Sequence, residues 1–243
     1  MIGLYIGYGY GYGYGYYMDP TYILIIIAAV ISLIAQVKVK STFSKYSSQR
    51  SRSGMTGAQA AERLLHSQGI YDVTIQRVGG KLTDHYNPGN KTLNLSESVY
   101  DNASVAAVGV AAHECGHAIQ HAKGYLPLAI RSALVPIANF GSRASWIFII
   151  LGVLFSFNQT LIYIGIFMFA AAVLFQLVTL PVEFNASRRA LQLLGEQGVL
   201  GNDEVSKTRK VLSAAAMTYV AAAATAVLQL LRLILLYGGR DRD

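Results

Sequence analysis

Three residues within the segment His113-Glu114-Cys115-Gly116-His117 have the types and the spacing of a hydrolytic zinc site. The surrounding residues 104–123 are rich in Ala and Val, contain no Pro and are followed by Gly124, which predicts one helix. Four residues along a helix bring His117 within roughly 40° of His113, so the two imidazoles can hold one zinc ion. Glu114 lies about 100° round the helix from His113, where it could take a proton from a water activated by the metal. The spacing therefore predicts ligands at His113 and His117, a catalytic base at Glu114 and one Zn²⁺ per chain.

The alternatives for this segment are weaker. Two packing histidines and a solvated glutamate would fit a polar helix, but the neighbouring residues are mostly apolar, and charges are seldom buried there without a partner. Cys115, the only cysteine, faces away from both histidines, so we expect a small packing residue and no disulfide within the chain. His121 lies one further turn along, and we expect it to contact a ligand or face solvent, because a tetrahedral site cannot easily reach three turns of one helix.

The composition is that of a membrane protein. Hydrophobic residues make up 53% of the 243 residues and charged residues only 14%, which indicates several membrane spans rather than an ordinary soluble domain. The formal net charge of +7 could suggest nucleic-acid binding, but no surface pattern of interleaved basic and aromatic residues accompanies it. Cations that flank membrane spans explain the charge better. We therefore expect a lipid bilayer, and no nucleic acid, among the partners.

Apolar runs and their boundaries divide the chain into six expected regions. These are a Gly-Tyr low-complexity tail (1–20), a first transmembrane helix (21–37), a catalytic domain (38–125), an interfacial helix with a transmembrane hairpin (126–180), a helix with the third metal ligand (181–210), and a C-terminal helix and transmembrane segment (211–243). The tail is expected to be flexible, the alternative being that its tyrosines anchor the first span at the headgroups. Pro181 is expected to begin a new helix. Because Lys and Arg are dense after residue 37 and absent from the hairpin turn, the catalytic domain is predicted on the cytoplasmic side.

The catalytic domain is expected to be a small α+β unit beside the motif helix. The patterns predict an amphipathic helix over 56–68, strands over 73–78 and 92–95, and a short helix from 96 onward. The second strand could offer an edge to which an extended peptide substrate adds; its residues are Thr92, Leu93, Asn94 and Leu95. In the predicted loop 84–90, Asp84 and His85 either contribute to the site or form a turn through local hydrogen bonds.

A catalytic zinc usually has three protein ligands, so a third is expected after His117. The acidic residues Glu196, Asp203 and Glu204 lie in a stretch containing Gly and Asn, where solvated charges are ordinary. Glu183 instead follows Leu-Pro-Val at the end of an apolar span, where an unpaired carboxylate is costly and usually functional. The alternative is a glutamate that only complements the dipole of a helix N-terminus. We predict Glu183 as the third ligand.

Several segments together resemble a known family. They are His113-Glu114-Cys115-Gly116-His117 with residues 118–121, residues 84–88, Leu180-Pro181-Val182-Glu183-Phe184-Asn185 with residues 186–190, and residues 19–22 and 215–224. In these segments the chain is similar to the putative neutral zinc metallopeptidase family of bacterial membranes (YugP-like). More distantly it resembles the HtpX and CAAX prenyl protease group, in which a membrane hairpin separates the two-histidine motif from a motif with a further Glu and an Asp. This resemblance implies Glu183 as the third ligand, but Ser187 stands in the place of the Asp.

The sequence thus predicts a mainly α integral membrane protein with about four transmembrane helices and a zincin-like catalytic domain. Its expected activity is that of a zinc metalloendopeptidase (gluzincin-like), acting on protein or peptide substrates that are membrane-associated. Candidates for stabilising the transition state or orienting the ligands are His85, Tyr219, Asp84 and Asn185. A silent zinc-binding membrane scaffold would not need Glu114, and a transporter with an intramembrane metal site would be expected to show internal repeats, which are absent from this sequence.

Overall fold

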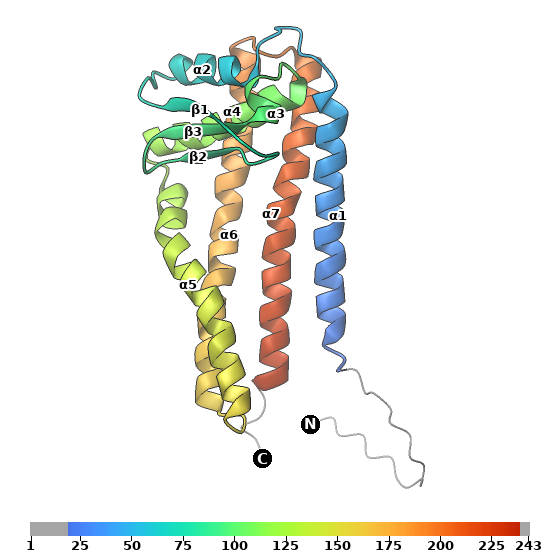
Figure 1. The fold of residues 1–243 in the computed structure, drawn as a ribbon, viewed down its shortest axis with the longest axis vertical. Helices are drawn as coiled ribbons and strands as arrows, with labels where there is room; N and C mark the ends of the chain where they lie inside the picture. Colours follow the sequence, from blue (N-terminus) through green and yellow to red (C-terminus); the bar gives the residue numbers. More distant parts are fainter. Residues whose placement is uncertain (1–18, 239–243) are drawn as a thin grey trace, which may run out of the picture.

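The computed structural model describes residues 19–238, and four long helices dominate this part of the chain. They are α1 (Tyr22–Ser47), α5 (Leu126–Leu154), α6 (Gln159–Glu196) and α7 (Asn202–Tyr237), and each is long and apolar enough to cross a membrane. Helices α1, α7 and α6 lie side by side, while α5 packs against α6 (Figure 1). The prediction of a mainly α chain with about four such helices is confirmed. The Gly-Tyr tail (1–20) lies outside the described residues except for its last two positions.

A small α/β unit sits at one end of the long helices (Figure 1). It consists of α2 (Gly57–Ser67), β1 (Thr74–Val78), β2 (His85–Asn87), β3 (Thr92–Ser96), α3 (Glu97–Tyr100) and α4 (Val105–Ala122). Its core includes Leu64 and Leu65 of α2, Leu93 and Leu95 of β3, and Ile119 of α4, all almost completely buried. The apolar stripe that predicted an amphipathic helix over 56–68 is therefore the face of α2 that packs on α4.

The sheet corrects two expectations. Its strand order is β1-β3-β2, with β1 parallel and β2 antiparallel to β3, so the predicted edge strand 92–95 is the central strand. All of β3 is buried because it pairs on both sides, and Thr92, Leu93, Asn94 and Leu95 cannot accept a further strand. The two edge strands are β1 and β2, and β2 lies inside the predicted loop 84–90 and pairs Tyr86 with Leu93. Its Asp, Asn, Pro and Gly residues predict a turn, but residues 85–87 form a strand.

Helix α6 corrects the expectation that Pro181 begins a new helix. It runs from Gln159 to Glu196 without a break and carries Pro181 in its interior. A proline inside a helix leaves one carbonyl without its usual N–H partner, which membrane helices tolerate when neighbouring groups compensate. Helix α5 contains both the predicted interfacial segment and the apolar run after it, and α7 runs from Asn202 to Tyr237.

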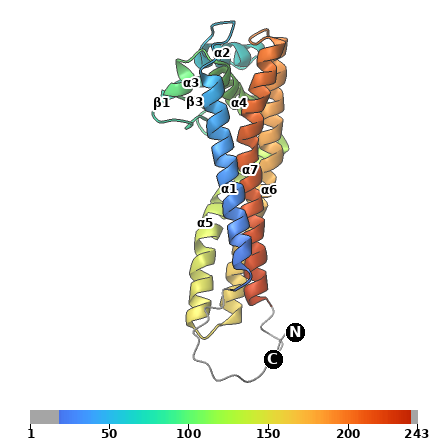
Figure 2. The same ribbon diagram turned by 90° about the vertical axis from the view of Figure 1, so that its right-hand side faces the viewer.

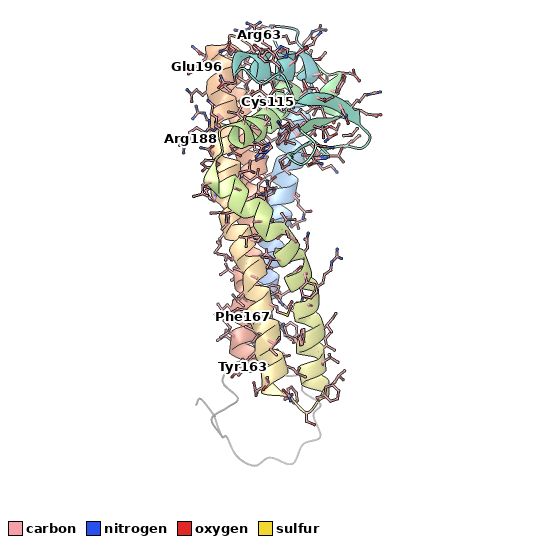
Figure 3. The ribbon with its side chains drawn as sticks, turned by 90° about the vertical axis from the view of Figure 1, so that its left-hand side faces the viewer. Arg63, Cys115, Tyr163, Phe167, Arg188 and Glu196 are labelled. Atoms are coloured by element: carbon pink, nitrogen blue, oxygen red, sulfur yellow. The ribbon has the colours of Figure 1, made fainter. Side chains whose placement is uncertain are left out.

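The course of the helices puts defined segments at each end of the bundle. The C-terminal ends of α1 and α6 and the N-terminal end of α7 lie beside the small α/β unit, and α5 begins just beneath this unit (Figures 1 and 2). Along α6, Arg188 and Glu196 lie at this end, whereas Tyr163 and Phe167 lie near the opposite end (Figure 3). The α5–α6 turn, residues 155–158, is therefore the bundle's length away from the unit that carries the two-histidine motif.

Candidate metal centre

Helix α4 positions the two histidines and Glu114. Ser104 caps its N-terminus, since the hydroxyl oxygen accepts a hydrogen bond from the Ala107 N–H at 3.2 Å. Most of the residues of α4 are buried, because α2, the sheet, α6 and α7 all contact it. Its small alanines, including Ala111 and Ala118, allow these elements to approach closely. The predicted helix over 104–123 is confirmed as residues 105–122 with its caps.

Glu183 of α6 meets both histidines. Its Oε2 lies 3.2 Å from Nε2 of His113 and 3.5 Å from Nε2 of His117. One ligand atom from each of the three residues lies within 4.8 Å of the other two. Among residues 19–238, this is the one group of three or more His, Cys, Asp or Glu side chains whose ligand atoms lie so close together. The structure thus brings the three predicted ligands together across 70 positions of sequence.

Two further side chains fix the orientation of the imidazoles. Gln120 donates its amide N–H groups to the Val182 carbonyl at 2.8 Å and to Asn185 Oδ1 at 3.0 Å, so its Oε1 must be the atom that faces His117 Nδ1 at 3.0 Å. His117 Nδ1 therefore carries a proton, and its Nε2 keeps a lone pair directed toward Glu183. Ser187 Oγ lies 3.1 Å from Nδ1 of His113, so the Nε2 atom of His113 also faces Glu183. Both rings present the atom that a metal would bind.

Gly116 allows α6 to lie close to the motif. A Cβ at this position would stand 2.5 Å from the Ala186 carbonyl oxygen and 3.0 Å from Ala186 Cα, which is too close for any side chain. The two helix backbones touch at this point, one turn from Glu183 along α6. Gly116 lies between the two histidines in sequence, so this close contact of α4 with α6 falls at the metal-binding group itself.

The group is buried and suited to a cation. Glu183 is 1% exposed, and its Oε1 has no hydrogen-bond partner among the described residues, although Arg131 Nη2 of α5 lies 3.5 Å away. Burial by itself lowers the pKa of His117, but the Glu183 and Glu114 carboxylates outweigh this effect and hold the pKa above its ordinary value. A buried carboxylate with an unused oxygen, next to two imidazoles with their Nε2 atoms turned inward, fits a divalent metal such as zinc.

Glu114 lies beside this group without belonging to it. It is 7% exposed, and its Oε2 accepts a hydrogen bond from the Tyr86 N–H of β2 at 3.0 Å. The strand β2 therefore holds the carboxylate in place by its backbone. Cys115, the next residue, is fully buried in the core with its thiol against the Ala61 carbonyl, and burial raises its pKa, which fits the expected packing role and not that of a reactive thiol.

The other predicted site residues divide into two groups. Tyr219 of α7 interacts with both Glu183 and Glu114, and Asn185 contacts Gln120, so these two border the metal-binding group. Asp84 instead accepts hydrogen bonds from the N–H and hydroxyl of Ser96, and His85 contacts Thr83 and Asn94 within the sheet. Neither is part of the group of three ligands. His121 also lies outside it, with Nδ1 2.8 Å from the Tyr86 hydroxyl.

The alternative third ligands are engaged elsewhere. Glu196 accepts a hydrogen bond from Gln192, and Asp203 forms an exposed ion pair with Arg52 at 2.8 Å. Glu204 is buried, but its two oxygens accept hydrogen bonds from the backbone N–H groups of Arg52 and Gly201, which caps α7. Each carboxylate therefore has a structural role away from the histidines.

Sequence reasoning missed Gln120 and Arg131. Gln120 is 0% exposed, and its position three residues after His117, on the same side of α4, was the signal that could have found it. Arg131 lies in the apolar first half of α5, where a lone cation needs a partner, but the sequence does not show that this partner is Glu183.

Comparison with known proteins agrees with this geometry. Residues 21–238 match the model of the family described as "Putative neutral zinc metallopeptidase". The chain is 47% identical over 224 residues to "Putative membrane protease YugP" of Bacillus subtilis (strain 168), an alignment that covers 91% of this chain and 99% of the relative. No solved structure matches the chain. The membrane-protease relative and the four long apolar helices together indicate a membrane protein.

Proposed function

Because the chain belongs to the putative neutral zinc metallopeptidase family, we propose that it is a zinc-dependent endopeptidase embedded in the membrane. The observation that carries the proposal is the buried group of His113, His117 and Glu183 with Glu114 beside it. The three ligands would hold one zinc ion per chain, in a gluzincin-like arrangement on a zincin-like helix. When bound, zinc would supply the positive charge that polarises a peptide carbonyl and makes a water more acidic.

The residues around the ligands are suited to peptide hydrolysis. Glu114 would take the proton from the attacking water and return it to the departing amine, since strand β2 holds its carboxylate beside the ligands. Tyr219 interacts with both carboxylates and is the side chain we assign to donate a hydrogen bond to the carbonyl oxygen as it gains charge. Gln120 and Ser187 would keep the imidazoles in the ligand tautomer.

The substrate is proposed to be an extended stretch of a membrane-associated protein or peptide. The free edge of the sheet next to Glu114 is β2, and the Tyr86 N–H already points from this edge to the Glu114 carboxylate. A peptide that pairs with β2 would be led past the metal ligands. We also propose that the chain crosses the membrane four times, with the small α/β unit on the cytoplasmic side, because the cations of residues 38–52 lie at that end.

One substitution separates this enzyme from a silent zinc-binding scaffold. Glu114→Gln keeps the size of the side chain but removes the base, so cleavage should fall by at least ~10²-fold while zinc stays bound. The control is Glu196→Gln, which lies at the exposed end of α6 and should leave both properties unchanged. The readouts are digestion of a casein or peptide library and zinc analysis of the purified chain. Unchanged cleavage by Glu114→Gln would remove this residue from the mechanism, and no cleavage by the parent protein with zinc bound would favour the scaffold.

A further inference from the structure

A large groove opens between α1, α6 and α7 on the surface of the bundle near the small α/β unit. Its volume is about 1040 Å³. Helix α7 lies between α1 and α6 at this level (Figure 2), so α7 forms the floor and the other two helices form the walls. The α7 residues that line the groove include Ala214 and Ala216, whose side chains are small.

The rim of the groove is strongly basic. Five cations from three helices line it: Lys38, Lys45, Arg188, Arg209 and Lys210. No acidic side chain is among the described residues that line the groove. None of the five cations forms an ion pair with an Asp or Glu of residues 19–238. Cations from α1, α6 and α7 therefore face one space with their charges uncompensated, which favours an anionic occupant.

The same groove also has apolar sides. Phe184 and Leu191 of α6 and Met217 of α7 line it, and Phe184 and Met217 are each 45% exposed. On α1 the groove begins at Lys38, the first cation after the apolar run 22–37, so it lies at the level where a hydrocarbon core would give way to headgroups. A basic rim over apolar walls at this depth matches an amphiphile with an anionic head.

We propose that this groove binds an anionic phospholipid, with its phosphate between the five cations and an acyl chain against Phe184 and Met217. The site is separate from the metal-binding group but adjoins it along α6, since Phe184 follows Glu183 and Ser187 lines the groove while contacting His113. A soluble acidic peptide would contact the cations but leave the apolar walls exposed to water. Free phosphate would bind the cations without contacting the apolar walls at all. The lipid uses both features.

The test compares matched pairs of lysines on the same two helices. Lys38→Gln with Lys210→Gln removes two groove cations, and Lys40→Gln with Lys207→Gln removes two that do not line the groove. The full chain in neutral detergent is titrated with fluorescent phosphatidylglycerol and, separately, with phosphatidylcholine of the same chain length. Each cation contributes about 1 kcal/mol near an anionic lipid, or roughly fivefold in affinity. We expect the parent to prefer phosphatidylglycerol, the groove pair to lose at least ~10-fold, and the control pair to change by less than ~3-fold.

Several results would overturn the proposal. Equal affinity of the parent for the two lipids, or equal losses in the two lysine pairs, would make the cations a general feature of the membrane interface. Displacement of phosphatidylglycerol by inorganic phosphate or by an acidic peptide at the lipid's own concentration would assign the groove to a soluble anion. Should the groove pair fail to fold, Arg188→Gln with Arg209→Gln removes two other exposed groove cations and must show the same loss.

Discussion

Substitution of Gly116 by alanine tests how the third ligand is positioned. The added Cβ would lie 2.5 Å from the Ala186 carbonyl oxygen and 3.0 Å from Ala186 Cα. Both atoms belong to the backbone of α6, so no side-chain rotation can relieve the overlap. Ordinary contact distances of about 3.5 Å would require α4 and α6 to separate by roughly 0.5–1 Å at this point.

This displacement is large compared with the tolerance of a metal site. Glu183 lies one turn before Ala186 on the same helix and must move with it, away from His113 and His117. Metal–ligand distances are held to within about 0.2 Å, so the shift should weaken zinc binding by at least ~10-fold. Overpacking should also lower the free energy of unfolding by about 1–3 kcal/mol. The loss of metal affinity is the specific effect.

Competition with a zinc chelator of known affinity measures this effect on the purified full chain. The matched control is Gly109→Ala, also on α4, where the new Cβ would meet Thr208 Cγ2 of α7 at 2.6 Å. That substitution crowds α4 against α7 but leaves the contact with α6 intact, so it should lower stability without a comparable loss of zinc. Parent-like zinc affinity in Gly116→Ala, or equal losses in both variants, would refute the reasoning that the glycine contact sets the position of Glu183.

Three further predictions follow from the same structure. Glu183→Gln keeps the size of the side chain but replaces the charged ligand by a neutral amide, so zinc titrated into the metal-free variant should bind at least ~10-fold more weakly; parent-like affinity would transfer the third ligand elsewhere. Glu204→Ala removes the acceptor of two backbone N–H groups, so chemical denaturation should show a loss of about 1–3 kcal/mol in unfolding free energy while zinc affinity stays unchanged. In a Cys115→Ala background, a single cysteine at Asn158 should react with an impermeant thiol reagent on intact cells, and one at Arg52 only after permeabilisation; the reverse pattern would invert the proposed orientation.

The long helices were predictable because their signals are local. Apolar runs long enough to cross a membrane identified α1 and the last two helices, and the two-histidine motif in an Ala-rich stretch identified α4. The sheet was less accessible. Residues 84–90 have the composition of a turn, and only the pairing of β2 with β3 makes three of them a strand, which no local propensity reveals. Pro181 was also misleading, because a proline is typical of the first turn of a helix, whereas α6 runs through this position.

The candidate site shows the same division between local and non-local information. His113, Glu114 and His117 follow from spacing alone, and Glu183 from the cost of a lone carboxylate beside an apolar span. Gln120 and Arg131 contact the proposed ligands only because α4, α5 and α6 are packed together. Polar side chains of this kind look like ordinary helix residues until their partners are known. The residues that could bind the metal are therefore easier to predict from the sequence than the residues that orient them.

The placement of Glu183 depends on helix packing along the whole length of α6. Below the site, glycines bring α5 and α6 together, since a Cβ at Gly141 would stand 2.9 Å from the Met168 carbonyl oxygen and one at Gly165 2.7 Å from that of Ser145. Close backbone approach through small residues is a common way for helices to associate in a membrane. At the site, Gly116 makes the corresponding contact between α4 and α6. Because α6 continues from its contacts with α5 through Pro181 to Glu183 without an intervening loop, a change in its packing against α5 in the proposed membrane span should reach the carboxylate. The affinity for the metal should therefore respond to the lipid environment of the bundle, even though the ligands themselves lie at its end.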